Sequence, residues 1–139
     1  MNTKKMTEKI ISYLKKDKYN FICVNFPNAD MVGHTGNFEA AKKAISVVDK
    51  YVDKIIKELL KKNGTALIIA DHGNADQMIN LKTKEMMTEH TLNPVPCILV
   101  SKKYSKNKIK NGILSDIAPT LLRILDIKKP KEMTGKSLI

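Results

Sequence analysis

The sequence predicts an α/β protein with three layers, in which helices cover both faces of a largely parallel sheet. Helical and strand-like segments follow one another in the order helix, strand, helix, strand, strand, helix. The strand-like segments are apolar on both faces, which is typical of strands buried in a parallel sheet. With 139 residues, 42% of them hydrophobic, the chain is long enough to bury a core, so a single domain over residues 1–139 is expected.

Three segments have the apolar spacing of amphipathic helices. Residues 3–16 place their apolar side chains on one stripe. In residues 38–62 apolar positions recur every three or four residues, and Asn63-Gly64 provides a C-terminal stop. A last helix is expected with Ser115 as a plausible N-cap and Asp116 as its first helical residue, and it should bury its leucines.

Three short apolar runs predict strands. Residues 19–26 contain β-branched and aromatic side chains and stop at Pro27, so they indicate a buried strand followed by a loop. Residues 65–70 and 95–100 are too short for helices and carry no charge. The polar residues 76–91 between these two runs predict a hairpin or a similar excursion.

The net charge of +11 raises the question of a nucleic-acid partner. Only Arg123 among the 25 positive residues is an arginine, and the lysines are spread over every polar segment without interleaved aromatic residues. Nucleic-acid readers favour arginine for bidentate contacts and aromatic residues for stacking. The charge therefore predicts a solvated lysine-rich surface and no nucleic-acid partner.

Composition also bears on where the protein works. No apolar run approaches the ~20 residues that cross a bilayer, and the lysine-rich amphipathic start differs from a secretory signal. We therefore expect no membrane partner and a cytoplasmic location. Cys23 and Cys97 each lie within an apolar run, which predicts two reduced thiols in the core.

The most distinctive feature of the sequence is its histidines. There are only three, and each has a carboxylate close by, in the patterns Asp30-Met-Val-Gly-His34, Asp71-His72 and Glu89-His90. Aspartate and neutral histidine are ligands for divalent ions such as Mn²⁺ and Zn²⁺. A helical turn would place residues 30 and 34 on the same face, within reach of a single ion.

Each pattern alone also fits a simpler explanation: a chance pair, a turn with an N-cap, or a surface histidine. Two of the three patterns nevertheless fall where a predicted strand ends, and ligands of open α/β sheets bind at the carboxyl ends of strands. Together they predict a metal site. The position of His90 relative to the other residues does not follow from the topology.

Several longer motifs resemble the C-terminal part of cofactor-independent phosphoglycerate mutase, a member of the alkaline phosphatase superfamily. The resemblance runs from about Lys4 to Ile139. The motifs, in chain order, are NADMVGHTG, TALIIADHGNAD, EHTLNPVP, GILSDIAPTLL and EMTGKSLI. The resemblance implies an alkaline phosphatase-like fold and a metal-binding domain of which this chain is the C-terminal portion.

The resemblance also implies an activity. Such enzymes interconvert 3-phosphoglycerate and 2-phosphoglycerate in glycolysis through a phosphoserine intermediate and two Mn²⁺ ions. By this resemblance Asp30, His34 and His90 match the side chains that hold one ion, while Asp71 and His72 match two ligands of the other. Zn²⁺ or another divalent metal is a possible substitute.

The chain departs from the family because the segments bearing an aspartate ligand, the nucleophilic serine and the substrate-gripping basic residues are missing. Its own serines lie in no matching context: Ser12, Ser46, Ser101, Ser105, Ser115 and Ser137. We therefore expect no catalytic residue here, no activity from the chain alone, and a partner in the missing N-terminal part of the enzyme.

Two alternatives remain. The chain could derive from another metalloenzyme of the superfamily, such as a phosphopentomutase or a phosphatase. It could also be a non-catalytic binding or assembly module that pairs an exposed sheet edge with another chain.

Overall fold

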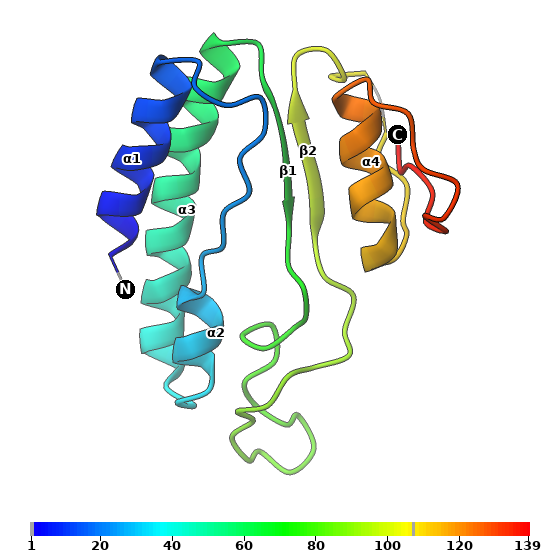
Figure 1. The fold of residues 1–139 in the computed structure, drawn as a ribbon. Helices are drawn as coiled ribbons and strands as arrows, with labels where there is room; N and C mark the ends of the chain where they lie inside the picture. The colour runs from blue at the N-terminus through cyan, green and yellow to red at the C-terminus, as the bar shows by residue number, and fades with distance from the viewer. Residues whose placement is uncertain (1, 107) are drawn as a thin grey trace.

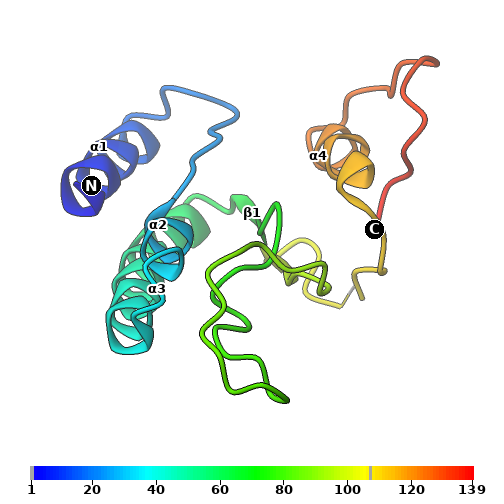
Figure 2. The same cartoon turned by 90° about the horizontal axis from the view of Figure 1, so that it is seen from below.

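The computed structural model describes residues 2–106 and 108–139 and contains helices on either side of a two-stranded sheet (Figure 1). The elements are α1 (Thr3–Lys15), α2 (Asn28–Gly33), α3 (Phe38–Lys61), β1 (Thr65–Ile69), β2 (Cys97–Ser101), a 3₁₀ turn (Leu114–Asp116) and α4 (Ile117–Ile124). Seen from below, α1 and α3 lie on one side of the strands and α4 on the other (Figure 2). None of the described helices is long and apolar enough to cross a membrane.

The two long helices that the spacing predicts are confirmed. The side chain of Asn2 accepts a hydrogen bond from the Lys5 amide at 3.0 Å and caps α1, and Asn37 caps α3 through the Ala40 amide at 2.9 Å. Ala41, only 1% exposed, lies in the first turns of α3. After α3 the chain turns at Asn63, whose positive φ of 56° is typical of a residue just beyond a helix end.

The strands at 65–70 and 95–100 are also found, but the expected parallel arrangement is wrong for them. β1 and β2 pair antiparallel, with Thr65 opposite Ser101 and Ile69 opposite Cys97. The loop between them returns at the end where β1 stops, so the second strand runs back without a crossover connection (Figure 1). Apolar side chains on both faces suit either direction, so the pattern could not distinguish the two.

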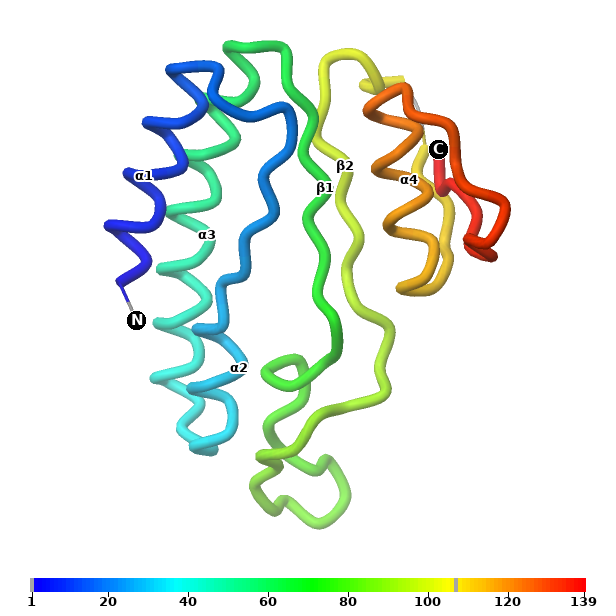
Figure 3. Tube along the Cα trace, viewed as in Figure 1, coloured from blue at the N-terminus to red at the C-terminus, as the bar shows by residue number. Residues whose placement is uncertain are grey.

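The predicted buried strand at 19–26 is a second correction. These residues are extended but form no strand, and Tyr19, Phe21 and Val24 are 49%, 51% and 38% exposed. Within the described part of the chain, no hydrogen bond joins residues 19–26 to another segment. In the tube view the segment descends between α3 and β1 on its way to α2 (Figure 3). An apolar run forms a strand only when its backbone pairs with another strand, and residues 19–26 have no such pairing in the described structure.

The expectation of two core thiols is wrong for Cys23, because that residue belongs to the unpaired segment and is exposed. Cys97 begins β2 and is half-buried, and this burial raises the pKa of its thiol. Both cysteines are free, as expected for reduced thiols.

The last helix begins one residue later than predicted, at Ile117, because Ser115 and Asp116 lie in the 3₁₀ turn. The carboxylate of Asp116 accepts hydrogen bonds from the amides of Ile113 at 2.9 Å and Lys136 at 2.8 Å, and both bonds lower its pKa. The buried Thr120 hydroxyl accepts from the Leu138 amide at 3.0 Å. These bonds hold the C-terminal tail against α4.

Candidate metal centre

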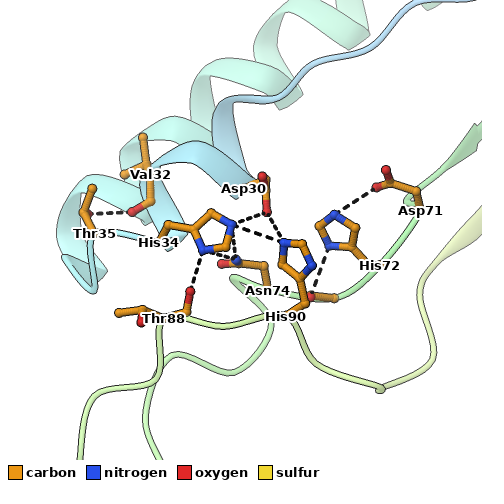
Figure 4. Close-up of polar contacts among 10 residues, drawn as sticks. Asp30, Val32, His34, Thr35, Asp71, His72, Asn74, Thr88 and His90 are labelled. Atoms are coloured by element: carbon orange, nitrogen blue, oxygen red, sulfur yellow. Dashed lines mark hydrogen bonds and ion pairs between the residues drawn. The ribbon is translucent and has the colours of Figure 1, made fainter.

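The predicted ligands lie close together, on α2, at its C-terminal end and on the connection from β1 to β2 (Figure 4). Asp30 is within α2 and His34 follows its last turn, so both project from the same face, as their four-residue spacing predicts. His72 lies just beyond the carboxyl end of β1, and His90 lies on the loop that leads into β2. The structure therefore brings all three histidines of the chain together.

Asp30, His34 and His90 form a nearly equilateral triangle of ligand atoms. The Oδ1 atom of Asp30 lies 3.3 Å from Nε2 of His34 and 3.3 Å from Nε2 of His90. The two Nε2 atoms are 3.2 Å apart. Ligand atoms about 2.1 Å from one tetrahedral ion would be about 3.4 Å apart, so the triangle has the dimensions of three ligands around a shared cation.

One oxygen of the Asp30 carboxylate, Oδ1, is buried without a hydrogen-bond donor. A buried carboxylate oxygen without a donor is unfavourable unless a cation or a proton lies against it. A divalent ion at the centre of the triangle would satisfy this oxygen, so the donor set fits a metal.

The orientation of His34 is set by contacts on the far side of its ring. The Nδ1 atom lies 2.6 Å from the carbonyl oxygen of Thr88, to which it donates when it carries the proton. That tautomer leaves a lone pair on Nε2, the atom that faces Asp30 and His90. Metal-binding histidines commonly use their other nitrogen in this way.

Sequence reasoning missed Asn74, which packs beneath His34. Asn74 is 7% exposed, and its Nδ2 atom lies 3.4 Å from the ring nitrogens of His34. Its Oδ1 atom occupies the place of a side chain at Gly33, where a Cβ would be only 1.9 Å away. Nothing in the local sequence pattern pairs Gly33 with a residue 41 positions later.

His72 joins the cluster by stacking on His90, whereas Asp71 lies at its exposed margin and contacts His72. The rings of His72 and His90 have centroids 3.6 Å apart and planes inclined by 20°. The Asp71 carboxylate lies 3.7 Å from Nε2 of His72, and its side chain is 82% exposed (Figure 4). Asp71 and His72 thus present an open pair of donors beside the triangle rather than a closed site.

Known proteins resemble this chain along its whole length. The sequence model of the Metalloenzyme superfamily matches residues 1–129. A 2,3-bisphosphoglycerate-independent phosphoglycerate mutase of Clostridium botulinum is 54% identical over 139 residues, which is all of this chain and 27% of that protein. The enzyme of Clostridium kluyveri is 52% identical over the same share, and one from Methanosarcina barkeri is 52% identical over 26% of its length.

A solved structure matches as well. The crystal structure of Leishmania mexicana phosphoglycerate mutase at low cobalt concentration superposes with a TM-score of 0.88 and 31% identity, covering 99% of this chain and 28% of that one. The chain thus spans about a quarter of the length of the relatives it matches. These findings confirm the resemblance that the motifs indicate.

Proposed function

This chain belongs to the Metalloenzyme superfamily, and we propose that it is the metal-binding part of a 2,3-bisphosphoglycerate-independent phosphoglycerate mutase. The observation that carries the proposal is the triangle of Asp30, His34 and His90, with its buried carboxylate oxygen lacking a hydrogen bond. The relatives are named as phosphoglycerate mutases. As the motif resemblance implies, we propose that the reaction of the whole enzyme is the interconversion of 3-phosphoglycerate and 2-phosphoglycerate in glycolysis.

Five side chains would hold two ions, Mn²⁺ in our proposal. Asp30, His34 and His90 would hold one, and Asp71 and His72 would contribute half of a second site that other residues complete. When bound, the ions would supply positive charge for the oxygens of a phosphoryl group in transfer. The Thr88 carbonyl and Asn74 keep the Nε2 atom of His34 directed at the ion position.

The phosphoryl acceptor would come from elsewhere in the enzyme. The hydroxyl of Ser101 is hydrogen-bonded to Thr65 at 2.8 Å, at the end of the sheet farthest from the histidines (Figure 1). Ser137 bonds within the C-terminal tail. We therefore propose that the chain alone is inactive and requires the remaining polypeptide.

We also propose that the remaining polypeptide completes a three-layer fold with a largely parallel sheet. The apolar residues 19–26 have an unpaired backbone, and β1 is paired on one side only. The arrangement superposes on part of a chain more than three times as long. A strand from that additional polypeptide would pair with residues 19–26 and bury their side chains.

A cytoplasmic location is part of the proposal. Both cysteines are free, and Cys23 is exposed, as suits a compartment that keeps thiols reduced. We propose separately that residues 1–139 form one portion of the phosphatase-like domain of the whole enzyme.

Calorimetric titration with Mn²⁺ tests the metal site. Wild type should bind, and Asp30→Asn and His34→Ala should each lose binding. Asp53→Asn is the matched control, because Asp53 is an exposed helix carboxylate paired with Lys57 at 2.7 Å. Equal binding by wild type, Asp30→Asn and Asp53→Asn would reject Asp30 as a ligand. Parallel titrations with Zn²⁺ and Co²⁺ compare the affinities of the site for different metals.

A complementation assay tests the activity. Mutase activity with Mn²⁺ is measured for this chain, for the Clostridium botulinum enzyme lacking the matching region, and for their mixture. Only the mixture should be active, and Cys23 should become protected from thiol reagents in it. Activity of the chain alone would refute the need for an external serine. Protection without activity in the mixture would favour the assembly-module alternative.

A further inference from the structure

We infer that Asp76 is a positioning residue for the metal centre: it fastens the loop after β1 to the loop before β2 and so holds His90 in place. The inference rests on the proposed metal site. We call the three side chains concerned, Asp76, Thr91 and Asn93, the Asp76 clasp.

The clasp joins residues that lie far apart in the sequence. Both carboxylate oxygens of Asp76 accept from the Thr91 hydroxyl, at 3.2 and 3.0 Å. Its Oδ2 atom also accepts from Nδ2 of Asn93, at 2.7 Å. Thr91 directly follows His90, so a bond to Thr91 restrains the backbone that carries the His90 ring.

A backbone contact continues the same junction. The Thr91 amide donates to the Gly73 carbonyl at 2.8 Å, and the two residues form an isolated antiparallel bridge. A Cβ on Gly73 would lie 2.1 Å from the Thr91 hydroxyl and 2.7 Å from Oδ1 of Asp76. Since Gly73 follows His72 and Thr91 follows His90, the junction sets the spacing at which these two rings stack.

The charge of Asp76 suits this role. Its donors are neutral, and among the described residues its carboxylate makes no ion pair, although the chain carries a net charge of +11. The bond from Asn93, followed by those from Thr91, lowers the pKa of Asp76. The carboxylate is therefore an ionised acceptor at neutral pH and orients the loop by charge-assisted hydrogen bonds.

A residue that acts on the metal centre through His90 can be told from one that only stabilises the fold. If Asp76 acts through His90, Asp76→Asn should weaken metal binding. Asp116→Asn should not, although Asp116 is also a carboxylate that accepts two hydrogen bonds, from the amides of Ile113 and Lys136. A general effect of lost stability on metal binding would appear in both variants.

The experiment measures Mn²⁺ affinity of the full chain by calorimetry and by the electron paramagnetic resonance signal of free Mn²⁺. Asp76→Asn and Thr91→Val should each weaken binding about 10- to 100-fold, as for other residues that orient metal ligands. Thr91→Ser keeps the hydroxyl and should restore affinity. Thr83→Val, on the exposed tip of the same excursion, is the matched control and should bind as wild type.

The outcomes are distinguishable. Loss of affinity in Asp76→Asn and Thr91→Val, with rescue in Thr91→Ser and wild-type affinity in Asp116→Asn, supports the inference. Wild-type affinity in both Asp76→Asn and Thr91→Val overturns it while the metal site stands. Absence of Mn²⁺ binding by wild type overturns both. If circular dichroism shows that Asp76→Asn is unfolded, the comparison of Thr91→Val with Thr91→Ser decides whether the inference holds.

Discussion

Residues 71–93 and residues 19–26 are opposites in composition and in structure. The first segment is mostly polar, yet it is held by bonds such as those from the Thr91 amide to the Gly73 carbonyl and from Asn93 to Asp76. The second is mostly apolar and extended, and in the described structure its backbone forms no hydrogen bond with another segment. A polar loop can satisfy its own groups locally, whereas an apolar strand needs a neighbour.

The two segments meet at α2, which carries Asp30. Because residues 19–26 lead directly into α2, the position of Asp30 depends on other supports. Nδ2 of Asn28 donates to the Thr3 hydroxyl at 3.1 Å and joins the start of α2 to α1. Asn74 packs against Gly33 at the other end of the helix. The metal centre is thus braced by the polar loops and by α1, independently of the unpaired segment.

Among substitutions that disturb these supports of α2, Gly33→Ala is expected to have the largest effect on stability. The new Cβ would lie 1.9 Å from Oδ1 of the buried Asn74, and overpacking of this kind costs about 1–3 kcal/mol of unfolding free energy. Urea unfolding measures the loss, and Mn²⁺ titration should show weaker binding as α2 shifts.

The double variant Gly33→Ala/Asn74→Ala is the control, since it removes the clashing amide. It should regain most of the stability lost in the single variant. A single variant as stable as wild type would mean that Asn74 moves aside freely and does not brace α2.

Acid is expected to loosen the polar loops through Asp76. Its pKa is lowered in the fold, first by the bond from Asn93. A depressed carboxyl pKa adds stability that is present above the unfolded value of 3.8 and is lost as the pH falls through the folded value. The unfolding free energy, measured with urea at steps from pH 6 to pH 3, should therefore decrease less steeply with falling pH for Asp76→Asn than for wild type.

Asp116 provides the comparison, because backbone amides of Ile113 and Lys136 lower its pKa. Asp116 lies at the start of α4, on the other side of the strands from α3 (Figure 1). Asp116→Asn should also flatten the acid dependence but leave Mn²⁺ affinity unchanged. If the unfolding free energy of Asp76→Asn depends on pH as steeply as that of wild type, the hydrogen bonds of the Asp76 clasp do not stabilise the ionised carboxylate.

The smallest effect is expected in the apolar segment. Val24 is 38% exposed and unpaired, so Val24→Thr should change the unfolding free energy of this chain by less than about 0.5 kcal/mol. Ile10→Val, at a residue 7% exposed on α1, should cost about 0.5–1.5 kcal/mol.

In the complementation mixture Val24→Thr should have a larger effect than Ile10→Val, because Val24 would then lie in a buried strand. Val24→Thr should weaken association with the remaining polypeptide, and Ile10→Val should not. Equal association by both variants would argue against pairing at residues 19–26.

The sequence by itself determined the elements whose signals are local. Helical spacing located α1 and α3 to within a residue at each end, and apolar runs located β1 and β2. The four-residue spacing placed Asp30 and His34 on one face of α2, and residue chemistry identified the three histidines as candidate metal ligands. These features depend on neighbours within a few positions, so a pattern can carry them.

Only the tertiary structure decided how these elements meet. The antiparallel direction of β2, the exposure of residues 19–26 and the arrival of His90 beside His34 all depend on contacts between distant segments. The supports of the site, from Asn74 to Gly33 and from Asp76 to Thr91, are also contacts across loops. Strand pairing and loop packing are satisfied by whichever backbone lies nearby, and a local pattern does not specify that neighbour.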